Sequence, residues 1–159
     1  MEYIITSMSE DIAYIISKWQ YEDEYAIYNT DSFEEMKRKN ASLVDKSKFE
    51  NYICFFDKHT NELVGYINIV KKENNDIFIG IGLAPNMCGK GLGADILKLG
   101  IAEAIRRYPY HAIVLQVRAW NERAIKCYIN AGFKIVKKEA TIDYKGELTE
   151  FVYMKYNEI

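Results

Sequence analysis

The stretch that most constrains the fold runs from Asp76 to Arg107 and reads DIFIGIGLAPNMCGKGLGADILKLGIAEAIRR. An apolar run over Ile77–Leu83 is followed by a glycine-rich turn over Gly89–Gly93 and then by apolar residues at helical spacing. This order predicts a strand, a loop and a helix. Glycines in such a loop let successive N–H groups point into one concavity at the helix start, where the helix dipole favours an anion. The pattern is typical of a phosphate cradle beside an open strand.

Two familiar phosphate loops and a plain tight turn compete with this interpretation. Gly89, Gly91 and Ala94 fit the dinucleotide pattern G-x-G-x-x-A. That pattern should follow its strand directly and be answered by a downstream acidic residue, whereas Ala84–Cys88 intervene here and no such acid is found. The P-loop pattern fails because Lys90 is followed by glycine rather than by Ser or Thr. On glycine spacing alone, a tight turn without a ligand stays an alternative.

A second pattern lies downstream, in the segment IVLQVRAWNERAIKCYINAGFKIV. It predicts a strand over Ile113–Val117, a polar turn at Asn121, a helix to about Asn130 and another strand after Gly132. Together the two segments resemble the GNAT family of N-acetyltransferases. The family motif R/Q-x-x-G-x-G/A falls on Cys88, Gly91 and Gly93. The family motif N-x-x-A-x-x-x-Y-x-x-x-G-F falls on Asn121, Ala124, Tyr128, Gly132 and Phe133. The resemblance covers residues 62–140 well and the N-terminal third loosely.

The resemblance implies an α/β (α+β) fold with a mixed, mainly antiparallel sheet of about seven strands flanked by about four helices. It implies a single domain over residues 1–159. It also implies an enzyme that moves an acetyl group from acetyl-CoA to a primary amine by direct attack in a ternary complex, with CoA as the product.

In this family the central strand splays from its neighbour, and the pantetheine arm bonds the exposed backbone as an added strand would. By motif alignment that backbone belongs to Ile81 and Leu83, and Gly82 between them keeps the approach open. The N–H of Ile81 would donate to the thioester carbonyl, where negative charge develops. Cys88 stands where the family usually has Arg or Gln, so that side-chain contact to the pyrophosphate is missing. The pyrophosphate would instead lie on loop amides, those of Gly89, Lys90, Gly91, Leu92, Gly93 and Ala94, with added charge from Lys90.

Tyr128 occupies the position whose hydroxyl, by resemblance, faces the cofactor sulfur as a general acid. A phenol with an ordinary pKa of about 10 stays protonated at neutral pH and can donate to a leaving thiolate. The alternative is a packing tyrosine. Asn121 would hydrogen-bond the pantetheine or cap the helix that follows it. No general base is assigned, because Ile77 stands at the position of the family's frequent glutamate. Glu22 or Glu24 acting through water, or solvent itself, are the alternatives.

The segment WQYEDEYAIYN, from Trp19 to Asn29, alternates aromatic and acidic residues and contains no basic one. In the family this loop borders the acceptor site. An acidic, aromatic rim would favour a cationic amine by Coulomb attraction and cation–π contact. The candidate acceptor-binding residues are Trp19, Glu22, Glu24 and Tyr25. A solvated turn with its tyrosines packed on the domain is an equal alternative, and the choice among a polyamine, an amino sugar, an amino acid and the peptide amine of a protein N-terminus stays open.

Composition argues against other classes of function. With 21 basic and 23 acidic residues, the chain has no basic footprint for nucleic acid. Its three cysteines form no C-x-x-C pair and its two histidines lie far apart, so we expect neither a disulfide framework nor a metal site. A charged start without a long apolar segment predicts neither a signal peptide nor a membrane span, and therefore a cytoplasmic protein. Whether the protein forms a homodimer is left open.

The rest of the chain predicts further elements in order. A strand covers Tyr3–Thr6, and a capping box from Ser7 to Glu10 begins a helix that reaches about Lys18. A short helix covers residues 32–39, and residues 40–50 form a loop with one helical turn. A hairpin follows in YICFFD and ELVGYINIVKK, and two strands over residues 134–141 and 148–156 close the chain.

Two other functions compete with the enzyme. A catalytically silent acyl-CoA-binding module, acting as a sensor or partner domain, is compatible with Cys88 and with the missing base, whereas Tyr128 favours activity. A dinucleotide-binding domain is disfavoured by the intervening loop and by the mainly antiparallel strand order.

Overall fold

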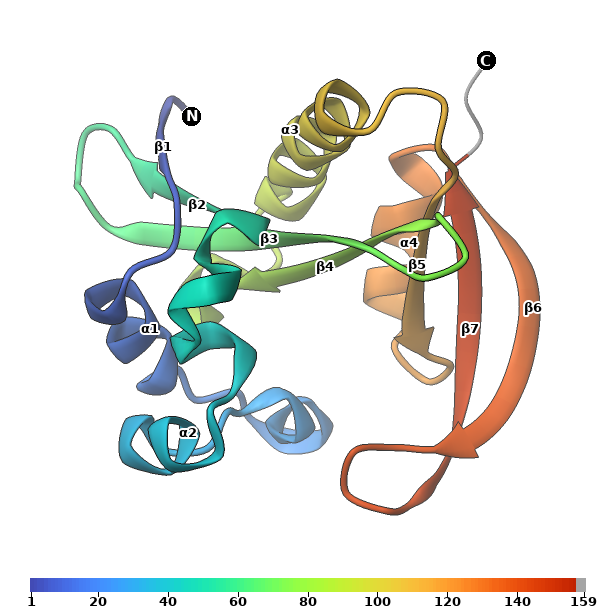
Figure 1. The fold of residues 1–159 in the computed structure, drawn as a ribbon, viewed down its shortest axis with the longest axis horizontal. Helices are drawn as coiled ribbons and strands as arrows, with labels where there is room; N and C mark the ends of the chain where they lie inside the picture. Colours follow the sequence, from blue (N-terminus) through green and yellow to red (C-terminus); the bar gives the residue numbers. More distant parts are fainter. Residues whose placement is uncertain (157–159) are drawn as a thin grey trace. The chain divides into compact units, whose positions relative to one another are not determined.

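The computed structural model describes residues 1–156 and contains a seven-stranded sheet with the strand order β1-β2-β3-β4-β5-β7-β6 (Figure 1). β4 and β5 pair in parallel, with Ile77 opposite Ile113. The pairs β1–β2, β2–β3, β5–β7 and β6–β7 are antiparallel, so the predicted mixed, mainly antiparallel sheet is confirmed. The strands are β1 Tyr3–Thr6, β2 Tyr52–Asp57, β3 Leu63–Lys71, β4 Ile77–Leu83, β5 Ile113–Arg118, β6 Phe133–Ile142 and β7 Leu148–Tyr156.

Four α-helices and four short 3-10 helices join the strands within residues 1–156. The α-helices are α1 Glu10–Ser17, α2 Phe33–Lys39, α3 Leu92–Arg107 and α4 Glu122–Asn130. The 3-10 helices are η1 Asp23–Tyr28, η2 Ser42–Val44, η3 Lys46–Asn51 and η4 Pro85–Met87. The predicted capping box is wrong in one detail: the N-cap of α1 is Ser9 rather than Ser7, and its hydroxyl accepts from the N–H of Ile12. Ser32 caps α2 in the same way.

The chain divides into two compact units, which are described separately. The first unit contains Met1–Asn68 and Ile81–Leu92, and the second contains Ile69–Gly80 and the chain from Gly93 onward. That the whole chain acts as a single domain stays a prediction. None of the helices within residues 1–156 combines the length and the apolar character that a membrane crossing needs.

In the first unit, α1 and α2 pack against one face of β2 and β3. Alternate residues of a strand point to the same face, and Tyr52 and Cys54 of β2 both lie in this core. Cys54 is fully buried, and burial raises the pKa of its thiol to about 12. The core residues are Met8, Ile12, Ala13, Ile16, Met36, Val44, Tyr52, Cys54 and Leu63.

In the second unit, β6 and β7 form the long curved hairpin seen in Figure 1, and β7 also pairs with β5. A buried ion pair supports the turn of this hairpin, because the Arg118 guanidinium lies 3.2 Å from Asp143 Oδ2. The same carboxylate accepts the N–H groups of Glu147 and Lys145, each at 2.9 Å. These bonds, with that of Glu147 contributing most, lower the pKa of Asp143. One buried carboxylate therefore organises the whole turn.

Candidate active site

The glycine loop between β4 and α3 has an open backbone of the kind that a phosphate needs. Gly89 and Gly91 adopt φ of +76° and +78°, in the left-handed region that favours glycine. No atom lies within 4 Å of the place that a Cβ would take at either residue. α3 begins at Leu92, so the end of the loop is also a helix N-terminus, where N–H groups and the dipole favour an anion. The backbone at these two glycines is therefore open at the start of α3, as an anion-binding loop requires.

Both ends of the glycine loop are packed among apolar side chains of the first unit. One apolar cluster of the first unit holds both ends of the loop, and its members are Val64, Ala84, Met87 and Leu92. The Cys88 thiol turns back to the carbonyl of Ala84, with an S···O distance of 3.5 Å. Cys88 therefore braces the turn at η4, while the side chain of Lys90 is exposed. Gly93 and Ala94, which continue into the second unit, form the first turn of α3.

The end of β4 carries the two residues that the motif alignment assigns to the pantetheine arm. Ile81 and Leu83 are both half-buried. The carbonyl of Leu83 accepts a hydrogen bond from the hydroxyl of Tyr21, which lies in the loop after α1. That carbonyl therefore already accepts one hydrogen bond from the protein.

Gly82, between these two residues, serves a different purpose from the predicted one. A Cβ at Gly82 would overlap the ring of Tyr66 and lie 2.8 Å from the Tyr66 hydroxyl oxygen. The expectation that Gly82 leaves an open approach is therefore wrong on this face, because a tyrosine of β3 fills the space. Gly82 is required because the Tyr66 ring lies directly on its backbone.

Tyr66 belongs to an aromatic cluster on the α1 side of the first unit. Its ring stacks on Trp19, with 6.2 Å between ring centroids and an interplanar angle of 16°. It also meets Tyr52 at 5.8 Å in a tilted arrangement. The hydroxyl of Tyr52 is bonded to Ser42 Oγ at 2.7 Å. Burial raises the pKa of Tyr66 and, less strongly, that of Tyr52. Trp19, a predicted acceptor-binding residue, is half-buried, and its ring lies against this cluster, stacked on Tyr66.

The acidic loop is the segment from Trp19 to Asn29. The side chain of Asn29 links its two ends. The N–H of Tyr21 donates to Asn29 Oδ1 at 2.7 Å, so the two ends of the loop meet across η1. Glu22, Asp23 and Glu24 are exposed, and none of the ion pairs among residues 1–156 involves them. Tyr25, also on η1, is half-buried. The loop thus presents three uncompensated carboxylates on a backbone that is tied down at both ends.

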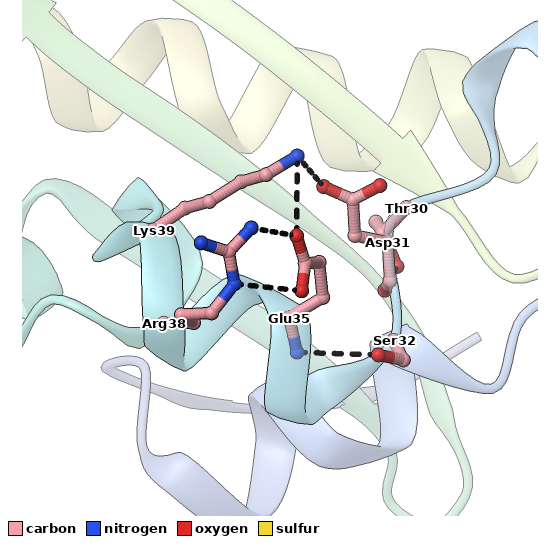
Figure 2. A network of polar contacts seen from close by, with 6 residues as sticks. All are labelled: Thr30, Asp31, Ser32, Glu35, Arg38 and Lys39. Atoms are coloured by element: carbon pink, nitrogen blue, oxygen red, sulfur yellow. Dashed lines mark hydrogen bonds and ion pairs between the residues drawn. The ribbon is translucent and has the colours of Figure 1, made fainter.

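Two of the three acidic residues that follow this loop, Asp31 and Glu35, are paired with cations, whereas Glu34 is exposed and takes part in none of the ion pairs within residues 1–156. Figure 2 shows that Lys39 reaches Asp31 and Glu35, with Nζ 3.1 Å from Asp31 Oδ2 and 3.7 Å from Glu35 Oε1. Arg38 bonds both oxygens of Glu35, and the Arg38 Nε lies 3.0 Å from Oε2. Because Asp31 and Glu35 are matched by cations, the uncompensated carboxylates of this stretch are those of Glu22, Asp23 and Glu24 in the loop, with Glu34 beyond it.

In the second unit, the motif around Tyr128 is a set of packing and capping contacts on α4. Asn121 is the N-cap, and its Oδ1 accepts from the N–H of Ala124 at 3.1 Å, which is one of its two predicted roles. Tyr128 is 9% exposed and meets Phe133 edge-on at 6.2 Å. Gly132 adopts φ of +109°, and a Cβ there would lie 2.9 Å from the Tyr156 ring. The structure therefore explains the spacing of the motif.

The predicted site residues are thus distributed over both units. The first unit brings together the acidic loop with Trp19, Glu22, Glu24 and Tyr25, the β4 segment with Ile81 and Leu83, and most of the glycine loop. Asn121 and Tyr128 lie on α4 in the second unit. Their roles in binding and catalysis stay predictions.

Three polar residues of the first unit escaped the sequence analysis: Tyr21, Tyr66 and Asn68. A signal for two of them is present, because Tyr66 and Asn68 alternate with apolar residues inside an otherwise apolar strand. For Tyr21 no local signal exists, since its partner Leu83 lies 62 positions away.

Comparison with known proteins places these features in context. The profile of the acetyltransferase (GNAT) family matches residues 13–133, most of the chain. No curated protein matches the chain in sequence. Among solved structures, an acetyltransferase of the GNAT family from Bacillus anthracis aligns with a TM-score of 0.79 and 13% identity, covering 98% of this chain and 94% of that chain.

Spermidine acetyltransferases have the same fold. A chimera of the spermidine N-acetyltransferase SpeG from Vibrio cholerae and hSSAT aligns with a TM-score of 0.77 and 18% identity, covering 98% of this chain and 95% of that chain. A mutant form of the spermidine/spermine N-acetyltransferase SpeG from Vibrio cholerae aligns with a TM-score of 0.71 and 16% identity, covering 97% and 93%. At these identities the likeness shows a shared fold.

Proposed function

Because the chain belongs to the acetyltransferase (GNAT) family, we propose that this enzyme transfers the acetyl group of acetyl-CoA to a primary amine of a small cationic molecule. Enzymes of this family use acetyl-CoA as the acyl donor. The observation that carries the choice of a cationic acceptor is the loop with Glu22, Asp23 and Glu24, three exposed carboxylates that no ion pair within residues 1–156 neutralises. The spermidine acetyltransferases that share the fold support the same choice.

The glycine loop would hold the cofactor. Its open amides over Gly89–Ala94 would accept the pyrophosphate, and Lys90 would add a positive charge. The N–H of Ile81 would donate to the thioester oxygen, where negative charge grows as the amine attacks. Acetyl-CoA would supply an activated acetyl group that an amine can take up without a covalent enzyme intermediate.

The chemistry asks for two proton movements. As the amine nitrogen forms its bond to the acetyl carbon, the bond from that carbon to sulfur breaks, and the hydroxyl of Tyr128 would donate its proton to the leaving sulfur. The amine loses its proton before or during attack, to solvent or through water to Glu22 or Glu24. Ile77, at the position of the family's frequent glutamate, is fully buried and can take no proton.

A thermal-shift titration followed by an activity assay tests this proposal. A ligand that binds only the folded state stabilises the protein by RT ln(1 + [L]/Kd), about 2.7 kcal/mol at a hundredfold excess over Kd. We expect acetyl-CoA and CoA to raise the melting temperature and NAD and ATP to leave it unchanged. Release of free thiol should then follow addition of spermidine and other multiply charged amines, and be weaker with a singly charged amine such as an amino sugar.

The contrary outcomes are distinct. A shift with both CoA species but no thiol release with any amine would favour the silent acyl-CoA-binding module. A shift with NAD alone would overturn the assignment of the glycine loop. Turnover that is indifferent to the charge of the acceptor would overturn the role of Glu22–Glu24.

A further inference from the structure

We infer that the phenol of Tyr66 and the side-chain amide of Asn68, two polar groups on one face of β3, form the subsite that receives the N–H groups of the acceptor amine. This inference rests on the proposed function and deepens it by naming the groups that recognise the amine. Neither residue belongs to the motifs in the sequence.

The position of the two residues follows from the register of the first unit. Tyr66 stands opposite Cys54 and Asn68 opposite Tyr52, so both side chains lie on the face of β3 that packs against α1. Residues two apart on a strand share a face and are separated by roughly 7 Å. The Tyr66 ring crosses to β4 and rests on the backbone of Gly82, between Ile81 and Leu83. The phenol therefore lies beside the backbone that is proposed to receive the thioester.

The second observation is an unsatisfied hydrogen-bonding group. The Asn68 amide oxygen is buried and has no hydrogen-bond partner among residues 1–156. The Tyr66 hydroxyl likewise makes no hydrogen bond within the described chain, whereas the neighbouring Tyr52 hydroxyl is bonded to Ser42. Buried polar groups are nearly always paired, and a buried acceptor without a partner is destabilising. One buried acceptor without a donor, beside a phenol on the same face that also lacks a hydrogen bond within residues 1–156, indicates a ligand that brings donors.

The chemistry of the neighbours identifies that ligand as an amine. An amine or ammonium group supplies several N–H donors, which matches two oxygen acceptors. Trp19 stacks on Tyr66 and adds an aromatic wall of the kind that attracts cations. Three residues further on, Glu22 begins the uncompensated acidic segment, so the approach to this wall is attractive to positive charge.

Tyr66 acts in this subsite by binding and not as the base. Burial raises the pKa of Tyr66, so its phenol stays protonated wherever the enzyme is assayed and accepts an N–H through its oxygen. The Asn68 oxygen is buried, so an amine reaches it only when neighbouring side chains move. The hydrogen bond that forms there offsets part of the free-energy cost of that movement. A site with two such acceptors discriminates strongly against a molecule without the N–H groups.

The test compares Tyr66→Phe with the matched control Tyr52→Phe. Both variants remove one hydroxyl from the same face of adjacent strands. Because Tyr66 gives up no protein hydrogen bond, Tyr66→Phe should keep the melting temperature and the acetyl-CoA KM, and raise the KM for a diamine about tenfold. Tyr52→Phe breaks the bond to Ser42, so it should lower the melting temperature and leave the amine KM unchanged. An unchanged amine KM in Tyr66→Phe, or equal increases in both KM values, would overturn the inference.

Asn68→Leu provides an independent readout. Replacing an unpaired buried amide by an apolar side chain of the same branched shape should leave stability unchanged or raise it, whereas a structural role for Asn68 would lower it. The same variant should raise the amine KM about tenfold and reduce the thermal shift that the diamine produces without any turnover. A less stable Asn68→Leu that binds the diamine as well as the wild type does would show that Asn68 is structural.

The failure of this inference differs from a failure of the proposed function. If the wild type acetylates a diamine and both variants keep its amine KM, the subsite alone is wrong. If the wild type neither binds nor acetylates any amine, the proposed function fails and the subsite fails with it.

Discussion

Among individual residues, Tyr128 is the one whose hydroxyl can be tested apart from its ring. The ring is buried on α4 and meets Phe133 edge-on, a contact that a phenylalanine would keep. We therefore expect Tyr128→Phe to retain the melting temperature and the affinity for CoA, and to lower kcat roughly 100-fold, the usual size of a general-acid contribution. Steady-state kinetics and a CoA titration measure the two effects. A large loss of CoA affinity would mean that Tyr128 serves packing or cofactor binding instead.

Two substitutions at Gly91 distinguish the effect of backbone strain from the effect of filling the proposed phosphate cradle. Its φ of +78° penalises any residue with a Cβ, at a cost of roughly 1–2 kcal/mol, while the surrounding space is open. Gly91→Ala and Gly91→Glu should therefore lose similar stability. Only the glutamate adds bulk and negative charge to the cradle, so CoA affinity should fall more than about 100-fold for Gly91→Glu and far less for Gly91→Ala. If calorimetric titrations gave the two variants equal affinities for CoA, this loop would not be the phosphate-binding site.

At the scale of elements, Tyr21 attaches the acidic loop to β4. The Tyr21 hydroxyl bonds the Leu83 carbonyl, and the Tyr21 N–H bonds Asn29, so one residue fixes both the loop and its attachment. Tyr21→Phe keeps the second bond and loses the first. We expect the KM for a cationic amine to rise severalfold while that for acetyl-CoA stays the same, because the carboxylates of Glu22–Glu24 lose their fixed position. An increase confined to the acetyl-CoA KM would show that Tyr21 instead shapes the β4 backbone.

The last turns of α3 contain a charge cluster whose contribution depends on pH. Glu103 accepts from Arg106 and Arg107, each at 2.7 Å, and bonding to Arg106 is the main reason why its pKa falls from 4.5 to about 2. A lowered pKa means that the stabilisation is complete above pH 4.5 and is lost as the pH falls towards 2. Its size is at most about 3 kcal/mol and smaller after screening by solvent.

Glu103→Gln should therefore lower the free energy of unfolding at pH 7, and this difference from the wild type should vanish near pH 2. Urea unfolding at a series of pH values measures it. Glu35→Gln is the matched control, because Glu35 also pairs with an arginine three residues on but is more exposed, so it should show a smaller difference. A difference for Glu103→Gln that persists to pH 2 would mean that the side chain acts through packing.

The elements that could be predicted from sequence are those with a period long enough to read. Strands such as Ile77–Leu83 and the helix at Glu122–Asn130 agree with prediction because apolar alternation or helical spacing extends over the whole element. The 3-10 helices over residues 42–51 are too short to show a period in the sequence. The N-cap of α1 is Ser9 rather than the predicted Ser7, because both serines fit the local pattern.

The candidate site likewise has one part that local sequence patterns predict and another part that they do not. The glycine loop and the Asn121–Phe133 motif are local in sequence, and the structure shows the positive φ angles, the cap and the ring contact that their spacing requires. Tyr66 on Gly82 and Tyr21 on Leu83 join residues far apart in the chain, so no local pattern reports them. Tertiary contacts of this kind also determine that Trp19 is half-buried and stacked on Tyr66.

At the scale of the whole molecule, the two compact units share elements instead of a linker. The chain passes between them at Asn68–Ile69 inside β3, at Gly80–Ile81 inside β4 and at the start of α3. Breaking such an element in one unit removes hydrogen bonds that continue into the other. We therefore propose that the units unfold together, as one cooperative domain.

Two cysteines make this testable without any mutation. Cys54 is fully buried in the first unit, and Cys127 lies on α4 in the second. Burial raises the pKa of both thiols, that of Cys54 to about 12. Buried Cys54 is closed to an alkylating reagent until its unit opens, and half-buried Cys127 reacts more slowly in the folded protein than in the unfolded chain. A brief pulse of iodoacetamide across a urea series, read by mass spectrometry of the peptides, should give one midpoint for both cysteines. The midpoint should rise equally for both when acetyl-CoA is added. Separate midpoints, or protection of Cys54 alone by the cofactor, would show that the chain consists of two domains that unfold independently.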